Sequence, residues 1–395
     1  MKAGLLGRLR RAGRQAGKEA VDSPRVSVVM SVYNCSSDVG RAIRSILDQT
    51  YRNFEFIIVD DASTDNSMEI VARFDDPRIR VLSNRENLGL ASSLNRGIRA
   101  ARGEFVARMD CDDVSLPARL KHQVRYMDRN PEVTVCGSFV RAFGHGSGVW
   151  HVPTEHEEIR AQLLFNNSIS HPSVMMRKSH LDTLPYVYEE GRRRVEDYEL
   201  WVRISPAFRL VNIDRPLLLY RTYDVRRLRK HPEVIAAGNV IRRGLLQEMD
   251  MDVSDGDLEL HMQISRSRRN DSVDFIVRAG DWFERLLAAH ERRPIYDPEA
   301  FLRTLGVRWW RVCKGSTELG PISRRLYLEH PLSRLHTARP IPRLGFVLRS
   351  WLRTRNDRFH PVLSDGLDYY RSLAAVGAGQ RGPGVNLHNK LESSQ

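Results

Sequence analysis

Cysteine is scarce in this chain of 395 residues. The four cysteines, Cys35, Cys111, Cys136 and Cys313, lie far apart, and no two of them form a Cys-x-x-Cys pair. This spacing argues against a disulfide framework, and no Cys/His cluster points to zinc. We therefore expect a protein of a reducing, cytosolic compartment.

Long apolar runs are also missing. No window approaches the roughly 18 apolar residues that a bilayer-spanning helix needs. The N-terminus is basic and lacks the continuous apolar core of a signal peptide. We expect a soluble, cytosol-facing protein that can still rest on the inner face of the cell membrane.

Acidic residues are outnumbered by basic ones, with 62 Lys and Arg against 49 Asp and Glu and a net charge of +13. Such an excess indicates an acidic partner, which could be nucleic acid, an anionic membrane or a phosphorylated substrate. The length predicts two or more domains with ample core.

The first 23 residues form a basic segment with apolar residues at helical spacing, among them Leu5 and Leu9. One interpretation is a short amphipathic helix lying on anionic lipid. The other is a solvated basic tail, because the apolar face is thin.

From residue 24 to about residue 225, short apolar runs alternate with helical patterns. This alternation is typical of a mainly parallel sheet that helices cover on both faces, an α/β fold. The expected strands are residues 26–32, 54–59, 79–82, 104–109 and 133–139.

Polar clusters follow three of these strands: Tyr33-Asn34, Asp60-Asp61 and the run from Asp110 to Asp113. In open α/β sheets, ligands bind outside the carboxyl ends of the strands. We therefore expect the three clusters to converge on one edge of the sheet and to form a ligand site there.

The acidic run Asp110-Cys111-Asp112-Asp113 is the strongest metal-site candidate. Asp-x-Asp also occurs at residues 250–252 and 255–257, but only this copy follows a strand-like run. Carboxylate oxygens suit a hard cation such as Mg²⁺ or Mn²⁺, and the sulfur of Cys111 does not. The alternative is a solvated acidic turn that caps the helix near Leu116-Pro117.

Beyond about residue 225 the strand patterns stop. Residues 226–375 show helical spacing, with Ile276, Phe283, Leu305 and Trp309 among the inward positions, and predict a helical extension. Residues 376–395 are rich in glycine and polar residues and predict a disordered tail.

The motifs together resemble those of the family-2 glycosyltransferases, which have the GT-A fold. The resemblance covers roughly residues 24–225, in the family's order and spacing, and does not extend to the helical third. The matching blocks are Val-Ser-Val-Val-Met-Ser-Val-Tyr-Asn at 26–34, Val-Asp-Asp-Ala-Ser-Thr-Asp at 59–65, Asn-Leu-Gly-Leu-Ala at 87–91 with Asn95 and Gly97, Ala-Arg-Met-Asp-Cys-Asp-Asp at 107–113, and Glu-Asp at 196–197.

The resemblance implies roles for eight residues around a nucleotide-sugar donor. It implies that Asp61 faces the base, that Asp197 is the catalytic base, and that a divalent ion sits on the donor diphosphate. The implied nucleotide-binding residues are Ser31, Tyr33, Asp60, Asp61 and Asp112, and the implied metal ligands are Asp110, Asp112 and Asp113.

The chain departs from the family pattern twice. Ser31 stands where many members have proline, a change that the backbone should tolerate. Leu94 stands where many members have arginine, so that any phosphate contact must come from elsewhere.

Several of these residues have a plainer alternative. Asp197 could only cap the helix that follows it, and Asp61 could belong to an Asx turn. Glu196 fits an orienting neighbour of the base better than the base itself. His171 and Arg221 are possible acceptor or diphosphate contacts, but His171 could be structural and Arg221 a surface arginine.

We therefore predict a metal-dependent, inverting glycosyltransferase that uses a nucleotide-diphosphate sugar, with UDP-sugars favoured. The expected acceptor is a hydroxyl of a glycan or a lipid-linked molecule, in the synthesis of cell-surface polysaccharide or glycoconjugate. A nucleotidyltransferase is the alternative, but it should carry a glycine-rich phosphate loop after the first strand. A nucleic-acid-binding protein is suggested by charge alone, and aromatics interleaved with the basic residues are missing.

Overall fold

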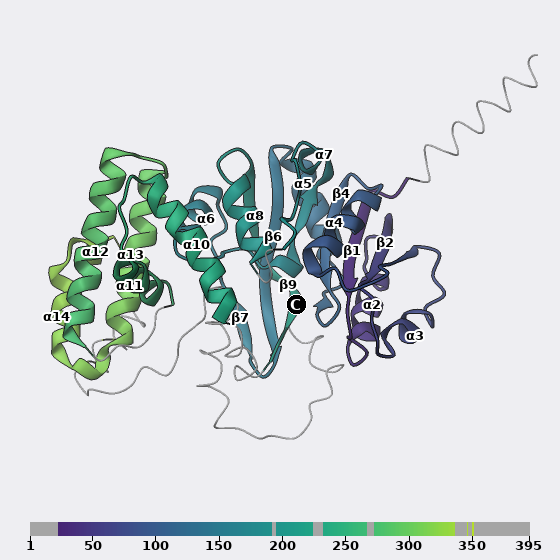
Figure 1. The fold of residues 1–395 in the computed structure, drawn as a ribbon, viewed down its shortest axis with the longest axis horizontal. Helices are drawn as coiled ribbons and strands as arrows, with labels where there is room; N and C mark the ends of the chain where they lie inside the picture. Colours follow the sequence, from purple (N-terminus) through teal and green to yellow (C-terminus); the bar gives the residue numbers. More distant parts are fainter. Residues whose placement is uncertain are drawn as a thin grey trace, which may run out of the picture.

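The computed structural model describes residues 23–191, 195–223, 232–266 and 272–335, together with residues 346 and 350. The predicted α/β class with a helical C-terminal part is confirmed (Figure 1). The basic segment predicted for residues 1–23, apart from its last residue, and the tail predicted for residues 376–395 lie outside the described residues.

Nine strands form one sheet in the order β3-β2-β1-β4-β8-β6-β9-β5, and β7 pairs with β6. All five predicted strands are present at nearly the predicted positions. The strands are β1 Val26–Val32, β2 Phe54–Asp60, β3 Ile79–Ser83, β4 Phe105–Asp110, β5 Val114–Ser115, β6 Val133–Gly144, β7 Gly148–Trp150, β8 Met175–Arg177 and β9 Arg209–Thr222.

The first four strands of this order run parallel, and so do β6 and β9. The short strand β8 lies antiparallel between β4 and β6, and β5 and β7 are also antiparallel to their partners. The sheet is therefore mixed, with parallel strands in the part where the polar clusters lie.

Side chains of β1 alternate between two apolar cores, as the period of a strand requires. Val28 and Met30 lie in one core with Ile43 of α2, whereas Val29 lies in the other core with Leu94 of α4. Helices thus cover both faces of the sheet. They are α2 Val39–Leu47, α3 Ser67–Val71, α4 Leu90–Ala100, α5 Arg119–Arg129, α6 His156–Leu163, α7 Lys178–Leu181 and α8 Glu196–Ile204, with the 3-10 turn η1 His171–Ser173.

In the described part of the chain beyond residue 223 every regular element is helical. These helices gather at one end of the molecule, away from α2 and α3 (Figure 1). They are α10 Pro232–Glu248, α11 Asp255–Ser265, α12 Val273–Arg292, α13 Pro298–Gly315 and α14 Pro321–Glu329, with the 3-10 turns η2 Thr317–Leu319 and η3 Pro331–Arg334. Their buried residues continue the same apolar core that α4, α6 and α8 build on the sheet.

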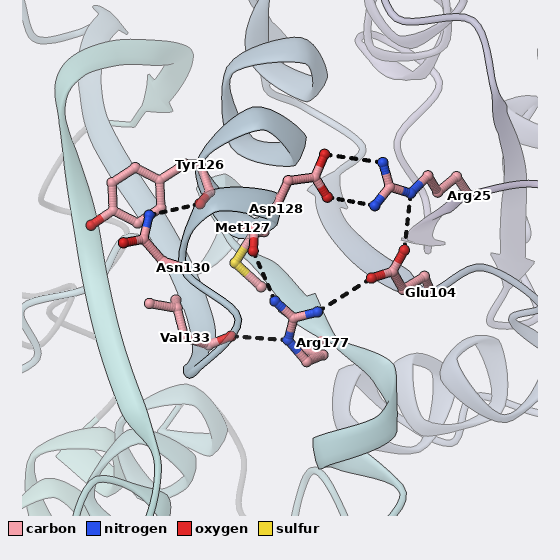
Figure 2. A network of polar contacts seen from close by, with 8 residues as sticks. All are labelled: Arg25, Glu104, Tyr126, Met127, Asp128, Asn130, Val133 and Arg177. Atoms are coloured by element: carbon pink, nitrogen blue, oxygen red, sulfur yellow. Dashed lines mark hydrogen bonds and ion pairs between the residues drawn. The ribbon is translucent and has the colours of Figure 1, made fainter.

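A polar network ties the sheet together at the edge where β1 and β4 begin (Figure 2). Arg25, just before β1, contacts Glu104 at 2.9 Å and pairs with Asp128 at the end of α5. Arg177 of β8 reaches the same Glu104 at 3.3 Å and donates to the Val133 carbonyl, also at 3.3 Å. The network holds β1, β4, β6 and β8 in register at the edge opposite the polar clusters.

None of the helices in the described ranges is long and apolar enough to cross a bilayer.

Candidate active site

The carboxyl ends of β1, β2 and β4 bring the predicted nucleotide and metal residues to one edge. Ser31 of β1 lies beside Asp110 of β4, and the neighbouring Val32 lies beside Asp60 of β2. The predicted convergence of the three polar clusters is therefore present in the structure.

The loops after β1 and β2 are bound to each other. The backbone of Asn34 has φ +49°, and its side-chain oxygen accepts a hydrogen bond from the Thr64 amide at 2.8 Å. The amide of Ser36 donates to Asp65 at 3.0 Å. Next to this junction Tyr33 is 48% exposed, so that this aromatic residue is accessible at the edge of the sheet.

Asp61 is buried and organises the loop that precedes α4. Its Oδ1 accepts from Asn84 at 2.7 Å and from the Leu88 amide at 2.9 Å, and its Oδ2 accepts from the Gly89 amide at 2.9 Å. The local hydrogen bond within this loop is made by Asp60 instead, whose carboxylate accepts from the Ser63 amide at 3.0 Å. Asp61 thus fixes the loop before α4, and its contact with a base stays a prediction.

Asp110, Asp112 and Asp113 form a cluster in which one carboxylate oxygen of each lies within 4.8 Å of the others. The end of β9 and the residue after it hold two of them in place. The Arg221 amide donates to Asp113 and the Tyr223 hydroxyl donates to Asp112, both at 2.7 Å. Ala118, not one of these acids, precedes α5, and it makes no side-chain cap. The cluster is therefore not a helix cap.

The electrostatics of the cluster fit a cation. Burial, together with the neighbouring charge of Asp110, raises the pKa of Asp112 to about 6. Burial and the charges of Asp112 and Asp110 raise the pKa of Asp113 well above its ordinary value. Its Oδ2 is buried without a hydrogen-bond partner among the described residues. A divalent ion among these oxygens would relieve the repulsion and satisfy the unpartnered atom.

Arg108 was not among the predicted site residues. This buried guanidinium contacts both oxygens of Asp110, at 2.5 and 2.6 Å. Its charge also opposes the burial that raises the pKa of Asp113 and of Asp197. Arg108 therefore favours the ionised form both in the acidic cluster and at Asp197. An arginine inside an otherwise apolar strand was a signal that could have identified it.

The predicted base, Asp197, lies in the first turn of α8 and is partly buried. Its Oδ2 accepts from Asn167 and its Oδ1 from the Tyr198 amide, both at 2.7 Å. Burial raises its pKa to about 6, although these two hydrogen bonds and the charge of Arg108 oppose the shift. The N-cap position belongs to Val195, so that Asp197 is not the cap of α8, and its role as the base stays a prediction.

The remaining predicted contacts differ in their surroundings. His171 is buried, with its Nε2 2.7 Å from the Tyr188 hydroxyl, and burial lowers its pKa well below the ordinary value. Glu196 is buried next to Asp197 at the start of α8. The side chain of Arg221 pairs with Asp38 and lies over the ring of Phe143, at 5.3 Å from the ring centre.

Comparison with known proteins gives a consistent result for the first part of the chain. The family model described as Glycosyl transferase family 2 matches residues 27–248. An uncharacterized glycosyltransferase of Haemophilus influenzae is 32% identical over 214 residues, which cover 51% of this chain and 66% of that protein, just under two thirds.

Two Escherichia coli relatives carry more specific names. The O-antigen biosynthesis glycosyltransferase WbnJ is 33% identical over 209 residues, which cover 50% of this chain and 80% of WbnJ. The UDP-Glc:alpha-D-GlcNAc-diphosphoundecaprenol beta-1,3-glucosyltransferase WfgD is 31% identical over 186 residues, which cover 47% of this chain and 71% of WfgD.

Proposed function

The chain belongs to glycosyl transferase family 2, with the GT-A fold, and we propose that it is a metal-dependent, inverting enzyme of cell-surface polysaccharide or glycoconjugate synthesis. The proposed donor is a nucleotide-diphosphate sugar, with UDP-sugars favoured. The proposed acceptor is a hydroxyl of a glycan or of a lipid-linked sugar. The acidic cluster with its buried, unpartnered oxygen on Asp113 is the observation that carries this proposal.

Asp110, Asp112 and Asp113 would hold Mg²⁺ or Mn²⁺, which neutralises the leaving diphosphate. On the nucleotide side, Tyr33 is half exposed, and Asp61 keeps acceptor capacity on Oδ2, which has one donor among the described residues. The other nucleotide contacts that we propose are Ser31, Asp60 and Asp112.

The chemical step is one displacement at the anomeric carbon. The acceptor oxygen bonds to that carbon while the bond to the diphosphate oxygen breaks, and the bonding electrons leave with the diphosphate. The Asp197 carboxylate takes the proton of the attacking hydroxyl. Because attack and departure occur on opposite sides of the carbon, an α-linked donor would give a β-linked product.

The name of one relative supports a more specific class of acceptor. WfgD acts, by its name, on a sugar linked through a diphosphate to undecaprenol. We propose an acceptor of the same class, a sugar diphosphate on a lipid, for this chain. Glu196 adjoins Asp197 at the start of α8, and Arg221 supplies a cation near the metal cluster. We propose these two residues and His171, which contacts the Tyr188 hydroxyl, as contacts of such a site.

A lipid-linked acceptor would place the enzyme on the cytoplasmic face of the membrane. The basic N-terminal segment, residues 1–23, would add about 1 kcal/mol of attraction per basic residue to an anionic surface, and salt would weaken it. We propose no nucleic-acid partner. The division into a catalytic domain of residues 24–225 and an extension of residues 226–375 is also a proposal.

A donor panel tests the proposed function. UDP-glucose, UDP-galactose and UDP-N-acetylglucosamine are each incubated with Mn²⁺ and a short-chain lipid diphosphate carrying N-acetylglucosamine, and UDP release and product are measured. We expect one donor to react, with an inverted linkage by NMR. Full activity in excess EDTA would remove the metal from the proposal, and a product of retained configuration would remove the single displacement.

A further inference from the structure

A short buried segment links the helical extension to the proposed base. Residues 164–167, which we call the base-supporting turn, follow α6, and all four are at most 9% exposed. The last of them, Asn167, donates from Nδ2 to Oδ2 of Asp197 at 2.7 Å. The position of the turn therefore sets the position of the side chain that holds this carboxylate.

Arg308 of α13 reaches the turn from the extension. Its side chain is fully buried and donates to the side-chain oxygen of Asn166 at 2.9 Å and to the Ser265 carbonyl at 2.7 Å. The guanidinium also lies over the ring of Phe165, 4.9 Å from the ring centre. One arginine thus contacts two consecutive residues of the turn.

His261 of α11 holds the preceding carbonyl. The Trp282 indole donates to His261 Nδ1 at 3.1 Å, so that Nε2 carries the proton and donates to the Leu164 carbonyl at 2.9 Å. Burial lowers the pKa of His261 to about 3, although the bond to Leu164 opposes the shift. The ring stays neutral and its tautomer is fixed.

Arg242 of α10 makes a third link. It is buried and donates from Nε to the Phe165 carbonyl at 2.8 Å, and its guanidinium lies 5.7 Å from the ring centre of Tyr198. The Tyr198 hydroxyl in turn donates to the Leu163 carbonyl at 2.5 Å, while its amide donates to Asp197. Arg242 of the extension and Tyr198 of α8 therefore both hold this segment, and Tyr198 also contacts Asp197.

Packing alone does not require these side chains. Burying a guanidinium is costly, and apolar residues of similar volume usually stabilise a core as well or better. Two buried arginines and a neutral histidine, each from a different helix, all donate to three consecutive residues of one turn. Such convergence fixes the turn in a single geometry, which is what a proton acceptor needs.

We propose that the helical extension positions the catalytic base: Arg242, His261 and Arg308 act as positioning residues that fix the base-supporting turn and, through Asn167, the carboxylate of Asp197. This inference rests on the proposed function, because it takes Asp197 as the base. The reaction concerned is that of the proposed site, from a nucleotide-sugar donor to a hydroxyl acceptor.

Turnover of the full-length Arg308→Met variant tests the proposal, with the most active UDP-sugar of the panel and saturating Mn²⁺. Since a small misplacement of a catalytic group can cost up to about 10²-fold, we expect kcat to fall tenfold or more while KM for the donor stays within about twofold. The hydrogen bond from Asn167 lowers the pKa of Asp197, so its weakening should move the acid limb of the pH profile to higher pH.

Two further variants separate positioning from general destabilisation. Arg308→Lys retains a charge but cannot donate to Asn166 and Ser265 at the same time with the geometry of arginine. Its kcat should lie between those of the parent and of Arg308→Met. Trp310→Phe changes a buried residue of the same helix, on the side of Tyr327 and Phe346, and should lower the melting temperature without moving the acid limb. Should Arg308→Met not fold, the lysine variant carries the test.

A double-mutant cycle tests whether Arg308 affects Asp197 through Asn167. If Arg308 acts through Asn167, its substitution should cost little more once Asn167→Ala is present, so that the two effects on kcat are not additive. Additive effects, or an unmoved acid limb in both Arg308 variants, would overturn the inference. Near-normal turnover of Asp197→Asn would instead overturn the assignment of the base in the proposed function.

Discussion

At the scale of single residues, Asp113 is the acid of the cluster whose charge is least favourable, because it is buried next to Asp110 and Asp112. We predict that Asp113→Asn abolishes transfer, because it removes a charge and an oxygen that the ion needs. Without metal the same change relieves repulsion and should raise the melting temperature. Thermal unfolding with and without Mn²⁺ checks this: the parent should gain stability from Mn²⁺ and the variant should not.

A stabilising effect of Mn²⁺ that is equal in the parent and in Asp113→Asn would place the ion elsewhere. Asp250→Asn is a suitable control. Asp250 belongs to another Asp-x-Asp motif, far along the chain from the cluster. Its carboxylate forms an exposed ion pair with Arg293. This variant should keep the Mn²⁺ response.

The proton acceptor is the second prediction at this scale. Asp197→Asn keeps the shape of the side chain but cannot take the proton, so we expect kcat to fall by about 10²-fold or more with donor binding nearly unchanged. Because the pKa of Asp197 is raised to about 6, the parent should lose kcat/KM as pH falls below about 6, instead of near its ordinary pKa.

Asp112 also has a raised pKa of about 6 and could produce the same acid limb. Saturating Mn²⁺ separates the two, because a bound cation favours the ionised form of its ligand and lowers the pKa of Asp112. An acid limb that stays near 6 in saturating Mn²⁺ belongs to Asp197. One that moves with Mn²⁺ concentration belongs to the cluster.

The position of Asp60, Asp61 and the run from Asp110 to Asp113 at one edge of the sheet could be predicted, because these acids follow apolar strand runs. Asp197 follows no such run and came only from the family resemblance. The residues that hold these acids could not be predicted. Asn167 and Tyr223 sit in segments without periodicity, and they meet Asp197 and Asp112 only through the tertiary fold, over 30 and 111 positions of sequence. Arg108 is the exception, since a charge within a buried strand is visible in the sequence.

At the scale of elements, the packing of α4 on the sheet depends on Gly97. A Cβ at this position would lie 2.4 Å from Val29 Cγ1 and 3.2 Å from Val59 Cγ2. For Gly97→Ala, overpacking costs about 1–3 kcal/mol, against about 1 kcal/mol gained in helix propensity. We therefore predict a net loss of stability, measured by urea unfolding. Unchanged or raised stability would contradict this packing.

Gly244 of α10 provides the matched control. A Cβ there would meet no heavy atom within 4 Å, so that Gly244→Ala gains helix propensity without a clash. The two alanine substitutions should therefore shift the unfolding midpoint in opposite directions.

The order of the sheet shows which elements a sequence pattern can predict. Five of the six strands with five or more residues have the apolar runs of buried strands, and these five were predicted. The longest strand, β9, was not predicted, because Asp214, Arg215 and Pro216 interrupt its apolar pattern. β8 has three residues and β5 only two, too few for any periodicity, and both run antiparallel. Yet β8 separates β4 from β6, so that the mixed character of the sheet depends on segments without a local signal.

At the scale of the whole molecule, the boundary predicted near residue 225 coincides with a change from strands to helices. The buried residues do not divide there. Trp201 of α8 and Trp282 and Trp309 of the extension belong to one apolar core that also includes Val29 of β1. The sequence motifs end near this boundary, and the family match ends at residue 248. Neither covers the later helices of the shared core, because packing between distant segments leaves no motif.

The shared core leads to the last prediction. A chain that ends at residue 223 would expose the base-supporting turn, whose Leu164 and Phe165 are fully buried, and would remove the partners of their carbonyl oxygens. The loss of these intramolecular hydrogen bonds and the exposure of apolar surface both disfavour the folded state. We expect this fragment to aggregate or to lack a cooperative melting transition. If it is instead a folded monomer that still turns over donor, the extension is a separate domain and the base needs no support from it.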